Sequence, residues 1–175
     1  MRVNTKLRGD YMKKFLIILI MIGTAVALYF AFTFFPDNRG IQGRYAFVDI
    51  NYVSPLSSTL WSKESRKNIQ YTIGKDYFAI EPGEKTKWVD VSYKKERIDA
   101  AFIKAQYGME SLAKEYIKIF FSKSSKGYRY VIIDKNKNEI GYHVFRIGGD
   151  IYVCETYKDY HKNGFVKIEE VKKLN

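Results

Sequence analysis

The chain has 175 residues, of which 46% are hydrophobic and 28% charged, and its formal net charge is +11. Its 15 Tyr, 12 Phe and 2 Trp exclude a low-complexity disordered protein, because disordered chains are poor in aromatic residues. The one cysteine, Cys154, excludes an intramolecular disulfide, so the fold depends on non-covalent contacts.

Residues 1–14 form a basic tail, and the 21 residues Phe15–Phe35 that follow carry no charge. A helix of that length is about 30 Å long, which matches the hydrocarbon core of a bilayer. Lys and Arg stay preferentially on the cytoplasmic side, and most of those near this run precede it. The sequence therefore predicts a single-pass anchor at 15–35 in the inner or cytoplasmic membrane. The N-terminus is expected in the cytoplasm and the rest outside it, in the periplasm if the cell is Gram-negative.

A cleaved signal peptide is the alternative interpretation of the same run. Lys13-Lys14 and the apolar stretch after them resemble its first two regions, and Ala25-Val26-Ala27 is a small-x-small cleavage pattern. The apolar run nevertheless continues to Phe35, before Pro36, which favours an anchor that is retained. Both interpretations place the remaining chain across the membrane.

A polar linker over 36–42 leads into an expected extracytoplasmic β-rich domain at 43–175. The first elements expected are a strand over Gly43–Tyr52 and a short helix over Ser57–Lys67 that begins at Ser57 or Ser58. Two strands over 68–73 and 77–80 then flank a turn at 74–76.

The middle of the domain combines one strand with one helix. We expect a single strand over Lys85–Tyr93, with Val89, Val91 and Tyr93 on one face and Trp88, Asp90 and Ser92 on the other. Apolar residues at helical spacing predict a helix over Met109–Phe120, although Tyr116–Phe121 taken alone is also compatible with a strand. Residues 98–107 give no clear pattern.

The C-terminal third predicts four strands joined by tight turns. The strands are expected over 128–134, 139–147, 151–157 and 165–171, with Gly148-Gly149 and Asn163-Gly164 in the connections. Short strands without helical crossovers favour antiparallel pairing. We therefore predict a mainly β fold, an antiparallel meander or small barrel-like sheet with one or two short helices, behind a single N-terminal transmembrane helix.

Gly43-Arg-Tyr45 at the start of a strand, followed by a short helix and a series of hairpins, resembles the lipocalin-type barrels. Their first strand carries Gly-x-Trp, and Tyr45 stands here in place of the Trp. The family's other marks are not evident, so no residue roles are carried over.

Catalytic, metal and cofactor sites are not expected. His143 lies within a predicted strand and His161 in a polar loop, and neither has metal-ligand spacing. Cys154 is expected to be a buried hydrophobic residue; a catalytic pairing with His143 across a hairpin depends on a register that the sequence does not fix. Glu155, Glu169 and Glu170 are the only candidate paired acids. These observations favour a binding protein over an enzyme.

The expected partners are the lipid bilayer, through Phe15–Phe35, and a protein or anionic surface. Nucleic acid is not expected outside the cytoplasm, and the basic residues are alternatively a solvated surface that guards sheet edges. A possible binding surface combines aromatic and basic side chains: Trp61, Trp88, Lys94, Lys95, Arg97, Tyr157, Tyr160 and His161.

Three binding functions remain open at this point, with an enzyme as a fourth and less favoured option. The first is an inhibitor or immunity-type protein, held at the outer face of the membrane to intercept another protein. The second is a lipocalin-like carrier or sensor of a small apolar ligand. The third is a non-catalytic subunit of an envelope assembly.

Overall fold

A computed structural model describes residues 15–26, 38, 40–57, 61–82, 86–107, 110–157 and 164–175. The chain divides into two compact units, residues 1–36 and 37–175. In the first unit residues 15–26 are helical, and residues 27–35 of the expected anchor lie outside the described residues.

Among the described residues, no helix combines the length and the apolar character needed to span a bilayer.

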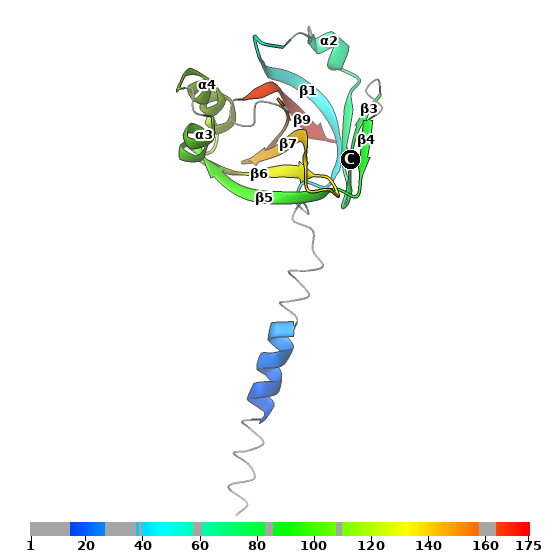
Figure 1. Cartoon of the computed structure of the whole chain (residues 1–175), viewed down its shortest axis with the longest axis vertical. Helices are drawn as coiled ribbons and strands as arrows, with labels where there is room; N and C mark the ends of the chain where they lie inside the picture. The colour runs from blue at the N-terminus through cyan, green and yellow to red at the C-terminus, as the bar shows by residue number, and fades with distance from the viewer. Residues whose placement is uncertain are drawn as a thin grey trace, which may run out of the picture. The chain divides into compact units, whose positions relative to one another are not determined.

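The second unit is mainly β, and its described part holds nine strands in one antiparallel sheet that curls into a half-barrel (Figure 1). The strand order is β4-β3-β2-β1-β9-β8-β7-β6-β5, so nearly every strand pairs with its neighbour in the sequence. The strands are β1 (Gly43–Val53), β2 (Gln70–Ile73), β3 (Tyr77–Glu81), β4 (Thr86–Val89), β5 (Ser92–Asp99), β6 (Lys126–Ile133), β7 (Glu139–Ile147), β8 (Asp150–Thr156) and β9 (Phe165–Lys173). The predicted antiparallel meander is confirmed, including the four C-terminal strands.

The two edges of the sheet, β4 and β5, are consecutive in the chain. Asp90 between them has φ = 56°, in the left-handed region, and it turns the backbone out of the ladder. The backbone N–H of Val91 donates to the Asp76 carbonyl at 3.0 Å, and the Tyr93 hydroxyl donates to the Tyr77 carbonyl at 2.7 Å. These bonds hold the first residues of β5 beside the turn between β2 and β3.

The single strand expected over Lys85–Tyr93 is therefore wrong. The turn at Asp90 reverses the alternation, so Val89 is 59% exposed whereas Val91 and Tyr93 are buried. Trp88 faces inward instead, with its ring centroid 5.6 Å from that of Phe78.

Both faces of the sheet are covered. On one face, the Trp88 ring lies 5.4 Å from the Tyr142 ring, which places β4 against β7 across the curl. On the other face, Phe120 of helix α4 (Glu110–Phe121) stacks on Phe145 of β7 at 4.6 Å. Side chains that alternate along one strand thus enter two different cores.

Two further helices complete the described part of this unit, α2 (Lys63–Arg66) and α3 (Ala100–Gln106). The helix predicted over Ser57–Lys67 is shorter than expected and begins later. Ser62 caps it, because the Ser62 hydroxyl accepts from the Ser65 N–H at 3.1 Å and the Ser65 hydroxyl accepts from the Ser62 N–H at 3.3 Å. Helix α4 confirms the amphipathic pattern, and α3 lies in the region that gave no clear pattern.

Candidate functional site

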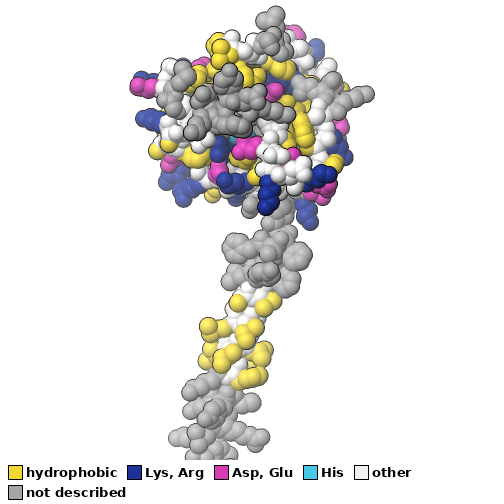
Figure 2. All heavy atoms as spheres, in the orientation of Figure 1, with side chains coloured by type: hydrophobic (Ala, Val, Ile, Leu, Met, Phe, Trp, Pro, Cys, Tyr) yellow, Lys and Arg dark blue, Asp and Glu magenta, His cyan; other side chains and the backbone are white. Residues whose placement is uncertain are grey.

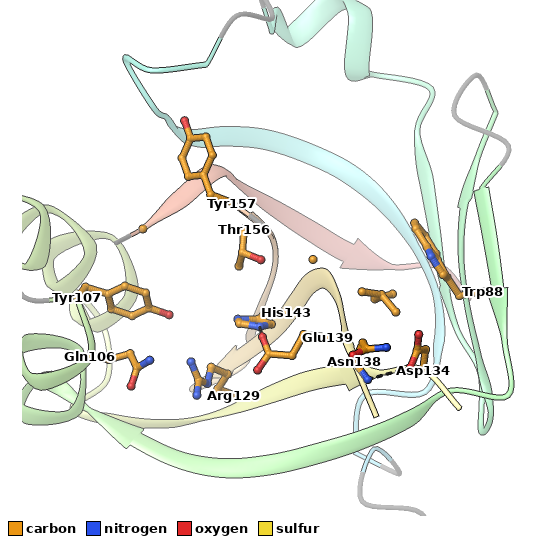
Figure 3. Close-up of a pocket in the computed structure, with 13 residues that line it drawn as sticks. Trp88, Gln106, Tyr107, Arg129, Asp134, Asn138, Glu139, His143, Thr156 and Tyr157 are labelled. Atoms are coloured by element: carbon orange, nitrogen blue, oxygen red, sulfur yellow. Dashed lines mark hydrogen bonds and ion pairs between the residues drawn. The ribbon is translucent and has the colours of Figure 1, made fainter. Parts of the chain in front are cut away.

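A cleft of about 530 Å³ lies beside the β6–β7 hairpin and reaches α3 (Figure 3). Its volume is within the range of about 300–1,000 Å³ that is usual for small-ligand sites. The residues that line it are Trp88, Gln106, Tyr107, Arg129, Asp134, Asn138, Glu139, Ile140, Gly141, His143, Thr156, Tyr157 and Gly164.

A β-bulge in β7 shapes this cleft. Val131 and Ile133 are two residues apart on β6, but their partners on β7, His143 and Glu139, are four apart. The extra length of β7 is accommodated at Gly141, whose φ of 86° is readily adopted by glycine. The bulge brings the Glu139 carboxylate back onto the His143 ring, with Nε2 and Oε2 3.0 Å apart.

His143 is held as a neutral imidazole with one ring nitrogen unused. Burial lowers its pKa, and the adjacent Glu139 carboxylate opposes this fall only in part. Because a carboxylate accepts hydrogen bonds, Nε2 carries the proton and Nδ1 is left as an acceptor. His143 is 5% exposed, and Nδ1 is buried without a hydrogen-bond partner in the described part of the chain.

Tyr107 reaches the cleft from the end of α3. Asp99 caps the start of this helix, since its side chain accepts from the Phe102 N–H at 2.9 Å, and Tyr107 is the residue directly after its last turn. The Tyr107 hydroxyl is buried beside the Arg129 guanidinium, which can only donate to it, and among the described residues its proton has no acceptor. Burial raises its pKa and the Arg129 guanidinium opposes this, so the group stays a protonated hydroxyl near neutral pH.

Arg129 lines the cleft and is paired with Glu96 of the neighbouring strand β5. Its Nε donates to Glu96 Oε2 at 2.9 Å, and Nη2 donates to the same oxygen. Its guanidinium carbon lies 4.9 Å from the centroid of the Phe102 ring. The ion pair makes this part of the cleft close to neutral. In Figure 3, Tyr107, Arg129 and His143 point into one space.

The cleft has a histidine–carboxylate pair but, among the described residues, no hydroxyl or thiol hydrogen-bonded to Nδ1. The register pairs His143 directly with Cys154, which settles the question that the sequence left open. Cys154 nevertheless belongs to the second core, the one in which Phe120 of α4 stacks on Phe145 of β7. Complete burial there raises the pKa of its thiol well above the usual value. A thiol in that environment is unreactive. Nor does any cluster of three metal-ligating side chains occur in the part of the chain that the structure describes.

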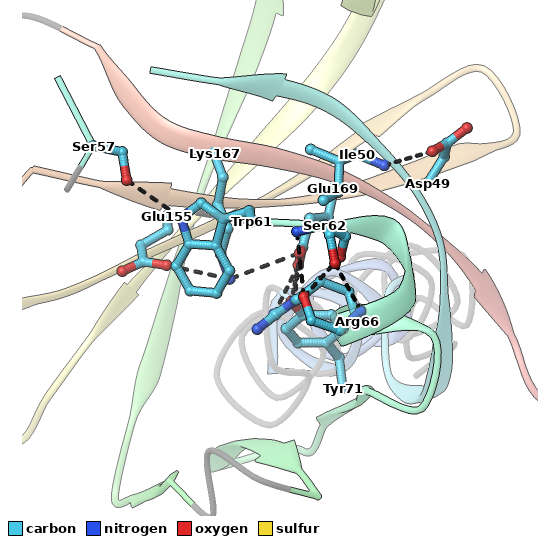
Figure 4. A network of polar contacts seen from close by, with 11 residues as sticks. Asp49, Ile50, Ser57, Trp61, Ser62, Arg66, Tyr71, Glu155, Lys167 and Glu169 are labelled. Atoms are coloured by element: carbon cyan, nitrogen blue, oxygen red, sulfur yellow. Dashed lines mark hydrogen bonds and ion pairs between the residues drawn. The ribbon is translucent and has the colours of Figure 1, made fainter. Parts of the chain in front are cut away.

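A second polar cluster, the ionic cluster, is buried between α2 and strands β2, β8 and β9 (Figure 4). Arg66 donates from Nε to Glu169 Oε1 at 2.8 Å and from Nη2 to Oε2 at 3.1 Å. The Tyr71 hydroxyl also donates to Glu169, and Lys167 Nζ lies 3.4 Å from Glu155 and 3.7 Å from Glu169. The side chains of Arg66, Lys167 and Glu169 are at most 3% exposed, and Glu155, which is 27% exposed, supplies the second carboxylate that balances the two cations.

Trp61 covers this ionic cluster. Its ring centroid lies 3.9 Å from Lys167 Nζ and 4.9 Å from the Arg66 guanidinium carbon. The indole N–H donates to the Ser57 hydroxyl at 3.3 Å. The two cations thus contact carboxylates on one side and an aromatic ring on the other. We interpret the ionic cluster as part of the structure of the fold and not as a ligand site.

The expected binding surface is only partly brought together. Trp88 and Tyr157 line the cleft, whereas Trp61 lies over the ionic cluster. Lys94, Lys95 and Arg97 follow one another on the edge strand β5, with Lys94 paired to Glu96 and Lys95 over the Tyr128 ring. Tyr160 and His161 lie outside the described residues. In Figure 2, lysine and arginine side chains are spread around the visible face and do not form one patch.

Sequence reasoning missed Tyr107, Arg129 and Glu139 and gave His143 only a structural role. His143 and Glu139 are four apart in a predicted strand, where that spacing normally separates two side chains by more than 10 Å. Gly141 between them was the one available signal of a bulge. Tyr107 lies in the stretch 98–107 that gave no clear pattern, and no motif in the sequence singles out Arg129.

Comparisons with known proteins add no relative. No protein-family model, no curated protein and no solved structure matches the chain. The likeness of Gly43-Arg-Tyr45 to lipocalin-type barrels therefore gains no support from a match, and the interpretation of the cleft depends on its geometry.

Proposed function

We propose that residues 37–175 form a binding domain whose cleft takes a small polar ligand. The observation that carries this proposal is the pair of buried polar atoms, His143 Nδ1 and Tyr107 Oη, that lack partners in the described structure. An unpaired buried polar group lowers the stability of a fold by about 1–3 kcal/mol. Two such groups on one cleft therefore need an explanation. A bound ligand that pairs with both is that explanation.

The polar lining favours this ligand over the apolar one expected of a lipocalin-like carrier. The aromatic side chains that would line an apolar cavity, such as Phe78 and Tyr142, are packed against each other and against Trp88. The cleft instead presents amide, carboxylate, hydroxyl and guanidinium groups. Binding is also favoured over catalysis, since the one thiol paired in register with His143 is buried and its pKa is raised.

The test is ligand-observed NMR on the full chain in a non-ionic detergent, with a library of small polar and small apolar compounds. The proposal expects hits among the polar compounds that His143→Gln weakens. Hits confined to apolar compounds, or hits that His143→Gln leaves unchanged, would contradict it.

A retained anchor at Phe15–Phe35 and an extracytoplasmic domain complete the proposal. They are supported by the uncharged run and by the basic residues that precede it. Reporter fusions after residue 175 give the test in a bacterial host: alkaline phosphatase should be active there and green fluorescent protein dark. Inactive alkaline phosphatase with fluorescent green fluorescent protein would refute the proposed extracytoplasmic location.

Interception of another protein, as by an inhibitor or immunity-type protein, is the second candidate. It is favoured by one observation, that β4 and β5 each have one side unpaired within the described sheet. An extended segment of a partner can add to such an edge by backbone hydrogen bonds. If the partner adds to β5, Pro substitution at Lys94 should abolish its capture in pull-downs, and capture that survives Lys94→Pro in a folded protein would exclude addition at that edge.

A further inference from the structure

We infer that the ligand of the cleft presents a hydroxyl group to Tyr107 and His143, and that it is a neutral saccharide. The inference depends on the proposed function, because it names the chemical class of the ligand for that same cleft. Each step below uses the donors and acceptors that the cleft leaves unused.

The two unpaired atoms have opposite requirements. The Tyr107 hydroxyl has a proton to donate, whereas His143 Nδ1 is a bare acceptor because Nε2–H is already directed at Glu139. Both atoms are buried, and both side chains point into the same space in Figure 3. A ligand group that contacts both must therefore accept one hydrogen bond and donate another.

This requirement separates the common ligand groups. A carboxylate accepts but cannot donate, so it would leave Nδ1 unpaired. An ammonium group donates but cannot accept, so it would leave the Tyr107 hydroxyl unpaired. A hydroxyl does both, since it has one proton and two lone pairs.

The surroundings favour a ligand with several hydroxyls and no net charge. An anionic ligand is disfavoured, because Glu96 already pairs with Arg129 and the lining also carries the carboxylates of Asp134 and Glu139. Asn138 and Gln106 add amide groups that both donate and accept. Trp88 supplies an apolar wall for the C–H face of a sugar ring.

The experiment uses the ¹⁵N-labelled full chain in an oligoethylene-glycol detergent, which carries no sugar headgroup. The chain has two histidines, so the imidazole nitrogens give two sets of signals, and His161→Gln identifies those of His143. The probes are glucose, galactose, mannose and N-acetylglucosamine, with acetate and butylamine as the charged comparisons.

We expect at least one sugar to bind and to shift the Nδ1 resonance of His143, with acetate and butylamine inactive. Tyr107→Phe removes only the hydroxyl and should weaken sugar binding roughly 2- to 10-fold, as expected for one neutral hydrogen bond. Tyr128→Phe, at a tyrosine that is 41% exposed and does not line the cleft, is the matched control and should bind as the parent does.

Three results would overturn the inference. Binding of acetate or butylamine without sugar binding, or sugar binding that leaves Nδ1 unmoved, refutes the hydroxyl while the proposed function stands. Binding of none of the probes, the result expected if the two atoms hold only a water molecule, refutes the inference and counts against the proposed function as well.

Discussion

The most informative perturbation of the fold is Glu169→Gln in the ionic cluster. Glu169 is fully buried and accepts two hydrogen bonds from Arg66, while Lys167 lies 3.7 Å away. Glutamine has nearly the same shape, so the substitution removes one negative charge and leaves the packing intact. Glu155, whose side chain is 27% exposed and which pairs with Lys167, is then the remaining carboxylate of the ionic cluster.

The size of the effect follows from these distances. At an effective dielectric constant of about 20, a charge at 2.8 Å contributes about 6 kcal/mol and one at 3.7 Å about 4.5 kcal/mol. The desolvation of the carboxylate, several kcal/mol, is recovered when its charge is removed. The net loss of unfolding free energy is therefore expected to be about 3–5 kcal/mol, the range found when one partner of a buried ion pair is removed.

Urea unfolding of the full chain in non-ionic detergent measures this loss. Glu110→Gln, at an i,i+4 pair in which both side chains are more than 70% exposed, is the matched control and should stay within about 0.5 kcal/mol. Lys167→Met combined with Glu169→Gln removes one charge of each sign, so it should cost less than the sum of its parts. A loss below about 1 kcal/mol for Glu169→Gln alone would refute the assignment of a closed buried ionic cluster.

Three further predictions concern the cleft and the second core. Because burial lowers the pKa of His143, the imidazole binds a proton at a higher pH in the unfolded chain than in the folded one. The free energy of unfolding should therefore fall as the pH drops below about 6.5, by at most about 1.4 kcal/mol per pH unit. His143→Gln should flatten this dependence in urea unfolding between pH 7 and 5, and parallel curves would contradict it. Gly141→Ala should lower the unfolding free energy by about 1–2 kcal/mol, because alanine rarely adopts the positive φ found at this position. The same substitution should shift the imidazole NMR signals of His143. An unchanged spectrum would show that the bulge does not set the contact between His143 and Glu139. The Cys154 thiol should react with a thiol reagent only after unfolding, and rapid labelling of the native chain would refute its burial.

The antiparallel meander could be predicted because its signals are local. Alternating apolar residues and glycine turns specify each C-terminal hairpin within about ten residues of sequence, and helix α4 has a clear amphipathic pattern. The break at Asp90 could not be predicted, since Val89, Val91 and Tyr93 alternate with polar residues across it, and contacts with the β2–β3 turn select the turned backbone. The start of α2 at Ser62 is a similar case, because several serines there are equally good caps.

The candidate site was largely unpredictable for a physical reason. Tyr107, Arg129 and His143 come from a helix end and two strands, and their meeting depends on a register and a bulge that a single sequence does not specify. The ionic cluster is a comparable case: Arg66 and Glu169 are 103 residues apart, and the sequence singled out only Glu169, as a candidate paired acid.

The central claim is that the free protein keeps the Tyr107 hydroxyl and His143 Nδ1 unpaired for a ligand, and the unfolding free energy of Tyr107→Phe without ligand tests it most directly. Deleting an unsatisfied buried hydroxyl should leave stability unchanged or raise it by about 1 kcal/mol, while ligand binding weakens. A loss of more than about 1 kcal/mol would show that the hydroxyl already has a partner in the free protein, and the claim would be wrong.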